Sequence, residues 1–451
     1  MKISFFGGAR SVTGANYLLE HDGLIMLVDC GLFQGSPEAE HLNYENFPYT
    51  ASEIDFVFVT HSHADHTGRL PKLYKEGFRG KLLSTEPTLD LIRKALPDNL
   101  SLLKDEAKYH GHAALFDSSD ITNILNLSQG LKYGNAFNCG RGITVTFHDA
   151  GHVLGSAIVE IRWDGKRIYF SGDLGNPPTP LLPEPFFPDD ADYIVIESAY
   201  GSRIHENKSE RSQLLIQTII NTINRGGTLM IPAFALERTQ ELLYELNNLI
   251  NEKKIPPVPI YMDSPLAISL TEVYHKYGGY FNKTAKYILK SDDDIFNFPG
   301  LRITKSSEES KEINEVIGPK VIIAGSGMSN GGRIQHHEKR YLPDPNSTIL
   351  FIGYQSEGTP GRKILDGQRT VRILGEIIPV RCDVVAIGGY SAHADQELLL
   401  KWVAKCNEAG KLKTVFIVQG ELESAEALAA RIKNDLNIDS IIPSLGQEIE
   451  L

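Results

Sequence analysis

The fold of this chain is indicated most directly by the stretch Ile54-Asp55-Phe56-Val57-Phe58-Val59-Thr60-His61-Ser62-His63-Ala64-Asp65-His66. Its first seven residues are mainly β-branched and aromatic, which predicts a short buried strand. The next six place three histidines and an aspartate in the loop that follows. Because alternate side chains of a loop can converge on one ion, His61 and His63 are predicted to bind a metal. Asp65 and His66 are predicted to bind a second ion about 3.5–4 Å away.

Two later segments supply side chains that a two-metal site would still need. His152 lies between glycines in the segment Phe147 to Ala157, and Asp173 ends an apolar strand. An aspartate suits the position between two cations because each of its oxygens can bind one. Upstream, Asp29 also ends a strand, where it can hydrogen-bond a metal-binding imidazole from behind. Turn formation would explain each segment alone, but their order after the histidine cluster favours a metal site.

Taken together, these motifs resemble those of the metallo-β-lactamase superfamily. The matching positions are Asp29, His61, His63, Asp65, His66, His152 and Asp173. The resemblance implies an αββα sandwich with two zinc ions at one end of the sheets. It would place the first ion on His61, His63 and His152. The second would lie on Asp65 and His66, with Asp173 between the two ions.

Further segments resemble the β-CASP group, the nucleases of this superfamily that process RNA and DNA. The segment Ile196 to His205, which contains Glu197, is similar to the first additional motif of that group. The segment Gly389 to Asp395, which contains His393, is similar to the second. The match continues through 226–241, 324–333 and 353–359. It covers nearly the whole chain and is greatest to prokaryotic relatives of the endonuclease subunit of the cleavage and polyadenylation specificity factor.

The predicted fold class is therefore α/β, a metallo-β-lactamase αββα sandwich with an inserted α/β β-CASP domain. The expected bounds are 1–207 for the first part of the metallo-β-lactamase domain, 208–370 for the β-CASP domain and 371–451 for the return segment. Strands predicted at 228–235, 321–324 and 348–354 indicate a parallel sheet in the insertion. The apolar segment Val384 to Ile387 is expected in the return segment.

The resemblance implies a zinc-dependent ribonuclease that hydrolyses single-stranded RNA and is expected to act endonucleolytically. Zinc lowers the pKa of bound water from 15.7 toward about 7, so a metal hydroxide would attack the phosphorus at a site completed by Asp65 and Asp173. His393, oriented by Glu197, would act as general acid on the leaving O3′. The products would carry a 5′-phosphate and a 3′-hydroxyl.

The charge balance bears on how RNA would be held. The chain has 57 acidic and 45 basic residues and a formal net charge of −12, whereas phosphate binding normally requires a basic surface. Phosphate contacts must then depend on local positive charge and loop amides. The residues predicted to bind substrate are Arg203, Ser326, Arg333 and Arg362. His336 and His337 are interpreted as packing or phosphate-binding residues, not as metal ligands.

Gln419 departs from the family pattern. RNA-type members carry Val-His-Gly-Glu, whose histidine completes the second zinc site, where this chain has Val418-Gln419-Gly420-Glu421. A glutamine oxygen is a weaker zinc ligand than imidazole, so the second site is predicted to be weakened. An RNA-binding pseudo-enzyme or a weakly active nuclease is the alternative to a ribonuclease. A small-molecule hydrolase is disfavoured by the long insertion, and DNA stays open as the substrate.

Composition predicts a folded intracellular enzyme. The 451 residues, 41% of them hydrophobic, can form two sizeable cores. The cysteines Cys30, Cys139, Cys382 and Cys406 are scattered without CxxC spacing, which is typical of a reducing compartment. No signal-type segment and no run of about 18 apolar residues occurs. A cytoplasmic protein without a membrane partner is expected, and a homo-oligomer is left open.

Overall fold

The computed structural model of the chain describes residues 1–205, 210–290 and 294–451. They form two compact units, of which the first joins Met1–Ile204 to Ala392–Leu451 and the second is His205–Ser391. The inserted unit therefore ends at Ser391, later than the predicted residue 370. No helix among the described residues is both long enough and apolar enough to cross a membrane.

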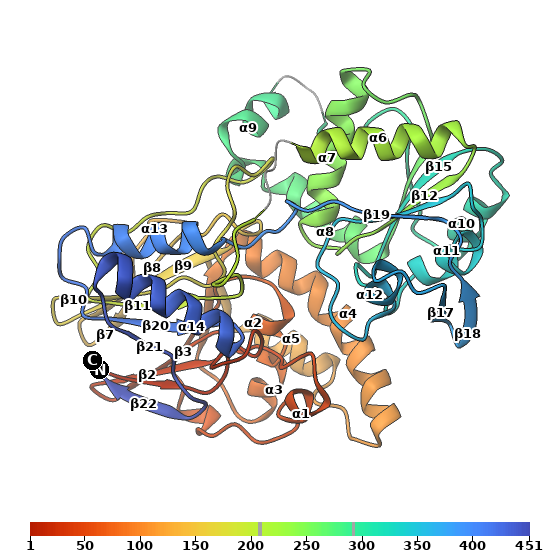
Figure 1. Cartoon of the computed structure of the whole chain (residues 1–451). Coiled ribbons are helices and arrows are strands. Elements are labelled where there is room, and N and C mark those ends of the chain that lie inside the picture. The colour runs from red at the N-terminus through yellow and green to blue at the C-terminus, as the bar shows by residue number, and fades with distance from the viewer. Residues whose placement is uncertain (206–209, 291–293) are drawn as a thin grey trace. The chain divides into compact units, whose positions relative to one another are not determined.

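The first unit contains two seven-stranded sheets that share one apolar core (Figure 1). The first sheet has the order β22 (Gln447–Glu450), β1 (Lys2–Phe5), β2 (Tyr17–His21), β3 (Leu24–Val28), β4 (Phe56–Phe58), β5 (Lys81–Thr85) and β6 (Ser128–Leu131). The second has the order β21 (Ser440–Ile441), β20 (Thr414–Val418), β11 (Tyr193–Glu197), β10 (Lys166–Phe170), β9 (Ala157–Trp163), β8 (Ile143–Asp149) and β7 (Phe137–Gly140).

Three clusters of buried apolar residues hold the layers of this unit together. The cluster between the sheets includes Phe5 and Phe58 from the first sheet and Phe170 and Phe416 from the second. A second cluster joins the first sheet to α3, α4 and α5, and a third joins the second sheet to α13 and α14. The helices are α1 (Pro37–His41), α2 (Ala64–Thr67), α3 (Leu70–Lys75), α4 (Glu86–His110), α5 (Ser118–Asn126), α13 (Gln396–Cys406) and α14 (Leu422–Arg431). Burial of both faces of each sheet confirms the predicted αββα sandwich.

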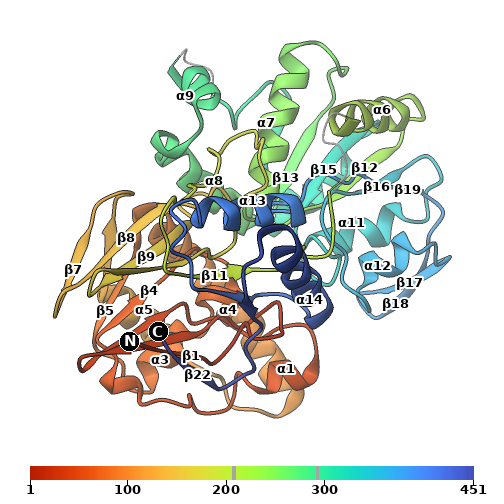
Figure 2. The ribbon, with the colours of Figure 1, turned by 60° about the vertical axis from the view of Figure 1, so that its left-hand side comes forward.

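Strand pairing brings together both the chain ends and the predicted ligands. β22 pairs with β1, so the two termini lie side by side (Figure 2). β3 and β4 are parallel, and so are β10, β11 and β20. Because the carboxyl ends of parallel strands meet at one edge of a sheet, the residues that follow these strands gather at the same end of the sandwich.

The second unit is built on a parallel sheet of six strands. Their order is β14 (Leu301–Ile303), β13 (Ile260–Asp263), β15 (Lys320–Ala324), β12 (Thr228–Pro232), β16 (Thr348–Phe351) and β19 (Asp383–Ala386). The helices are α6 (Arg211–Asn224), α7 (Arg238–Asn251), α8 (Pro265–Lys276), α9 (Lys283–Lys290), α10 (Ser307–Glu312), α11 (Ile334–Tyr341) and α12 (Pro360–Leu365). All five strand pairs are parallel, as the sequence predicts for the insertion.

The end of the insertion differs from the expectation. Val384 to Ile387 was expected in the return segment, but β19 pairs with β16 at the edge of the second sheet. The hairpin of β17 (Thr370–Ile373) and β18 (Glu376–Pro379) precedes it. Pairing with β16 gives the backbone groups of β19 hydrogen-bond partners within the second unit.

Candidate metal centre

Four candidate metal ligands, three of them buried and His63 partly exposed, converge at the end of the sandwich. Nε2 of His61 lies 3.0 Å from Nδ1 of His63, which lies 3.3 Å from Nε2 of His152. Oδ2 of Asp173 lies 3.4 Å from Nε2 of His61 and 3.5 Å from Nε2 of His152. One ligand atom from each of the four falls within 4.8 Å of the others. Three imidazole nitrogens and a carboxylate oxygen are a donor set that a single zinc ion can bind.

The turn after β4 positions this group. His61 lies in the loop after the strand and His63 has extended backbone, but Ala64–Thr67 forms the single-turn helix α2, where a loop is predicted. The turn projects Asp65 and His66 from successive positions. It can approach the segment after β3 because Gly31 has no side chain: a Cβ at Gly31 would lie 1.5 Å from the carbonyl oxygen of Asp65.

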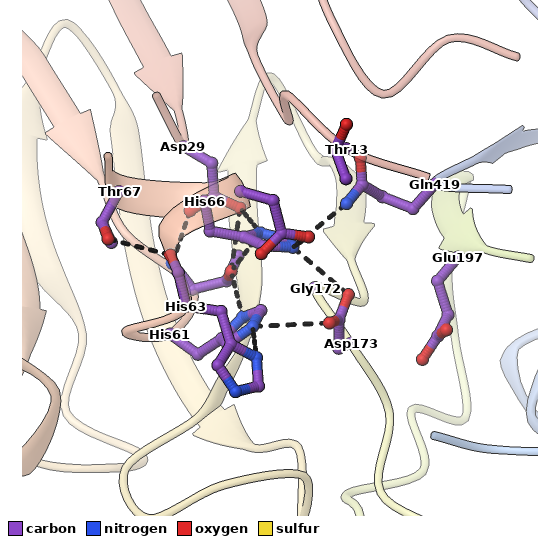
Figure 3. Close-up of polar contacts among 12 residues, drawn as sticks. Thr13, Asp29, His61, His63, His66, Thr67, Gly172, Asp173, Glu197 and Gln419 are labelled. Atoms are coloured by element: carbon purple, nitrogen blue, oxygen red, sulfur yellow. Dashed lines mark hydrogen bonds and ion pairs between the residues drawn. The ribbon is translucent and has the colours of Figure 1, made fainter. Parts of the chain in front are cut away.

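Asp173 connects the first group of ligands to a second group. Its Oδ1 lies 3.3 Å from Nε2 of His66, whereas its Oδ2 faces His61 (Figure 3). Oδ2 of Asp65 lies 3.7 Å from the same nitrogen of His66. Burial favours the neutral form of Asp173, but the imidazoles of His66 and His61 outweigh it and hold its pKa well below the usual range. An ionised Asp173 can offer one oxygen to each group.

Asp29 supports the second group from behind. Its Oδ2 lies 2.7 Å from Nδ1 of His66, which directs Nε2 of that ring toward Asp173. Thr60 fixes Asp29 in turn, because its backbone NH and hydroxyl both donate to the carboxylate at 2.8 Å. Sequence patterns did not single out Thr60, although it directly precedes His61. Burial lowers the pKa of His66, but nearby carboxylates, with Asp173 first, raise it well above the ordinary value.

His152 is oriented by the returning chain. Its Nδ1 lies 3.3 Å from the carbonyl oxygen of Ala392, which leaves Nε2 facing the first group. Burial, together with neighbouring imidazoles, lowers the pKa of His152 and of His63 well below the ordinary value. Neutral imidazoles have lone pairs to offer, so these residues fit a bound divalent cation.

Gln419 follows β20 and reaches the second group. Its Nε2 lies 3.1 Å from Nε2 of His66, and the hydroxyl of Tyr17 donates to its Oε1 at 3.5 Å. The side chain is buried and lines a small cavity with Tyr17, Asp29 and His66. In this orientation the amide NH₂ faces His66. The side-chain amide would have to flip, so that its oxygen faces the second group, before Gln419 could act as a metal ligand.

His393 and Glu197 form a pair beside the ligands. Nδ1 of His393 lies 3.2 Å from Oε2 of Glu197 and 3.8 Å from Oδ2 of Asp173. Glu197 is fully buried at the end of β11, and the backbone NH of Leu174 donates to its other oxygen at 2.5 Å. Burial lowers the pKa of His393, but Glu197 and Asp173 outweigh it and raise the pKa to about 9. The imidazole is thereby poised to hold a proton at neutral pH.

The residues predicted to bind substrate lie in different surroundings. Arg203 belongs to the first unit and is exposed. The other three belong to the second unit. The guanidinium of Arg333 donates to Asp263 at 2.7 Å and to two backbone carbonyls, that of Arg362 pairs with Asp366, and the hydroxyl of Ser326 pairs with Asn330.

Comparison with known proteins identifies the family. A metallo-beta-lactamase superfamily domain matches residues 18–174, a Beta-Casp domain matches 239–364, and a Zn-dependent metallo-hydrolase RNA specificity domain matches 377–443. Together with the candidate metal-binding residues at the end of an αββα sandwich, these matches define a metal-dependent hydrolase of nucleic acids.

Similar proteins match this chain over almost its full length. Ribonuclease TTHA0252 of Thermus thermophilus is 37% identical over 100% of this chain and 98% of its own. An RNase J-like protein of Methanocaldococcus jannaschii is 31% identical over 98% of both chains, and transcription termination factor FttA of the same organism is 30% identical over 98% of this chain and 71% of its own. The chain belongs to the β-CASP group of the metallo-β-lactamase superfamily, among prokaryotic relatives of the cleavage and polyadenylation endonuclease.

A solved structure shows the same fold. The crystal structure of a protein of unknown function from Enterococcus faecalis V583 superposes with a TM-score of 0.60, covering 100% of this chain and 99% of that one. The two sequences are only 13% identical, so this likeness supports the fold alone.

Proposed function

We propose that the protein is a zinc-dependent ribonuclease that cleaves internal bonds of single-stranded RNA. The observation that carries the proposal is the His393–Glu197 pair, with Nδ1 of His393 only 3.8 Å from the carboxylate of Asp173. An acid beside a metal-binding carboxylate suits hydrolysis of a phosphodiester. The match to an RNA specificity domain and the names of two relatives support RNA as the substrate.

The residues present fit two metal positions. His61, His63, His152 and Asp173 would hold the first ion, and Asp65, His66 and Asp173 the second. When bound, zinc supplies a Lewis acid and lowers the pKa of water to about 7. Asp29 and the carbonyl of Ala392 hold the two imidazoles beside them in the orientation that ligation requires.

Proton transfer to the leaving group is assigned to His393. With a pKa of about 9, its imidazole is protonated at neutral pH and can donate to the departing O3′. Glu197 holds Nδ1, so the opposite edge of the ring is the one directed at substrate. The products would carry a 5′-phosphate and a 3′-hydroxyl.

The four predicted substrate contacts remain part of the proposal. Arg203 is exposed and can contact phosphate as it stands. Arg333 and Arg362 already pair with carboxylates, so each would have to share its guanidinium with a phosphate. Ser326 would exchange its contact with Asn330 in the same way.

Gln419 supports a second candidate function. Its amide occupies the position that faces His66, where the family provides an imidazole. A second metal bound only by Asp65, His66 and Asp173 would be held weakly, and the protein would then bind RNA with little or no cleavage.

A circular single-stranded RNA separates these functions. It has no ends, so its conversion to linear product by the zinc-loaded protein would establish endonucleolytic cleavage. The His393→Ala variant, measured at equal zinc content, is the control for contaminating nuclease. Tight binding of the circle without linearisation, at any added zinc or manganese concentration, would favour the RNA-binding pseudo-enzyme instead.

A further inference from the structure

The short helix α9 (Lys283–Lys290) presents one face that carries only cationic and aromatic groups. Lys283, Lys286, Tyr287 and Lys290 stand at positions i, i+3, i+4 and i+7, which share one face of a helix. Lys283 and Lys290 are exposed, Lys286 is partly exposed, and Tyr287 is 75% exposed. We call these four residues the α9 face.

The opposite side of α9 anchors it. Ala285 is fully buried. Leu289 packs against Gly278 in the turn before the helix, where a Cβ added to the glycine would lie 2.5 Å from Cδ1 of Leu289. In both ribbon views α9 lies at the periphery of the second unit, away from the sheet (Figures 1 and 2). Anchoring on one side fixes the direction in which the α9 face points.

Local charge makes this face unusual for the chain. The 15 residues from 276 to 290 contain four lysines, three tyrosines and no acidic residue, in a protein of net charge −12. Within the described residues, no ion pair or side-chain hydrogen bond involves Lys283, Lys286 or Lys290. Their positive charge is therefore not neutralised by neighbours in that part of the chain.

We propose that the α9 face binds the backbone and one base of single-stranded RNA. The proposal rests on the function proposed above, with RNA as the substrate. Three lysines about one helical turn apart complement successive phosphates, and an exposed tyrosine offers a flat surface on which an unpaired base can stack. An acidic protein would satisfy the lysines, but it would leave most of the Tyr287 ring without a flat partner. The combination therefore favours a single strand.

Binding should be tested with full-length protein and a labelled single-stranded RNA of about 30 nucleotides. The triple variant Lys283→Gln/Lys286→Gln/Lys290→Gln removes the charges and retains helix-forming residues. It should bind at least tenfold more weakly at low salt, and the slope of log affinity against log salt should become about 2 units less negative. The matched control replaces Lys253, Lys254 and Lys311, exposed lysines in the turn after α7 and on α10, with glutamine. An equal effect in both variants would overturn the proposal.

Tyr287 supplies an independent readout. Tyr287→Phe retains a flat ring and should bind RNA as the natural protein does, whereas Tyr287→Leu should bind several-fold more weakly. RNA carrying 5-iodouridine should crosslink to the peptide that contains Tyr287. Equal affinity of the leucine and phenylalanine variants, without that crosslink, would exclude base stacking. Asp292 and Asp293, which follow in sequence, lie outside the described residues and stay unchanged in every variant.

Cleavage of substrates of different length separates failure of this proposal from failure of the proposed function. The triple lysine variant should cleave a tetranucleotide at the natural rate, because so short a substrate has few phosphates to spare for a second surface. It should cleave the long RNA with a raised KM and an unchanged kcat. Absence of cleavage in the natural protein would reject the ribonuclease, while the binding measurements would still decide on the α9 face.

Discussion

Two buried aspartates each have histidine among their neighbours, yet they differ in how far these neighbours lie from the carboxylate. Asp263 in the second unit accepts from His337, Arg333, Thr304 and Ser310 at 2.6–2.7 Å. Asp173 in the first unit has three imidazole nitrogens at 3.3–3.5 Å from its oxygens.

These distances indicate the role of each aspartate. The contacts of Asp263 have the lengths of charge-assisted hydrogen bonds. Burial raises its pKa, but these donors, His337 first, hold the pKa well below the usual range. Around Asp173 the imidazoles converge on common points and not on the carboxylate itself, which suits ions held between them. A composition of histidine and aspartate therefore does not identify a metal site without the spacing.

Replacement of Asp173 should give the largest effect. Asp173→Asn keeps the shape of the side chain but removes the charge and one metal-binding oxygen. We expect cleavage to fall by about 10³-fold or more and bound zinc to decrease, because several kcal/mol of metal-derived stabilisation depend on it. Zinc content by elemental analysis and single-turnover cleavage check this. If the variant kept the zinc content and cleavage rate of the natural protein, Asp173 would be a structural residue like Asp263 and not a metal ligand.

Replacement of His393 should slow cleavage and spare the metal. His393→Ala is expected to lose about 10²–10⁴-fold in rate, the contribution of a general acid, with zinc content unchanged. The pKa of about 9 predicts that the natural rate declines as pH rises above that value, because the imidazole loses its proton. That decline should be absent in the variant. A pH–rate profile of the same shape in both proteins would remove His393 from this role.

Replacement of Asp263 should affect folding and not zinc. Asp263→Asn leaves the buried His337 and the largely buried Arg333 without their charged partner. Breaking such a pair costs about 3–5 kcal/mol of unfolding free energy. Denaturant unfolding and zinc analysis should show a destabilised protein with full zinc content. Loss of zinc in the folded variant would contradict the contrast between the two aspartates.

The same residues show which features of the structure could be predicted from the sequence. His61, His152 and Asp173 come within a few residues of the ends of β4, β8 and β10, so short motifs after apolar strands could single them out. The contact of Arg333 with Asp263 joins residues 70 positions apart, and that of His152 with Ala392 joins residues 240 apart. Such partners are set by packing between distant segments. For the same reason β19 could not be assigned to its sheet: its apolar residues suit either unit, and only pairing with β16 decides.

Glu338, next to His337, gives a test by pH. It is fully buried, Ser329 donates to one of its oxygens, and burial raises its pKa from 4.5 to about 8. A raised pKa means that the folded state prefers the protonated form. Its contribution to stability is therefore present below about pH 4.5 and is lost as pH rises through about 8.

Glu338→Gln should remove this dependence. The variant is expected to gain about 3–5 kcal/mol of unfolding free energy over the natural protein at pH 9 and about 1 kcal/mol at pH 5, since one pKa unit corresponds to about 1.4 kcal/mol. Denaturant unfolding at both pH values measures the difference. A gain of equal size at both would indicate a change in packing, not the loss of a titrating carboxyl.

The smallest effect is expected from replacement of Gln419, which lies in the candidate metal centre but contacts His66 at a hydrogen-bond distance. Its amide nitrogen lies 3.1 Å from Nε2 of His66, so the second group already has a polar contact at hydrogen-bond distance, as Asp263 has. Gln419→His would replace the amide with an imidazole, which is a better zinc ligand than a glutamine side chain. We expect the second zinc to bind about 10-fold more tightly and cleavage to rise at limiting zinc. Calorimetric titration of the metal-free proteins measures both sites. Two equally tight sites in the natural protein, with no gain in the variant, would show that Gln419 does not limit the second metal.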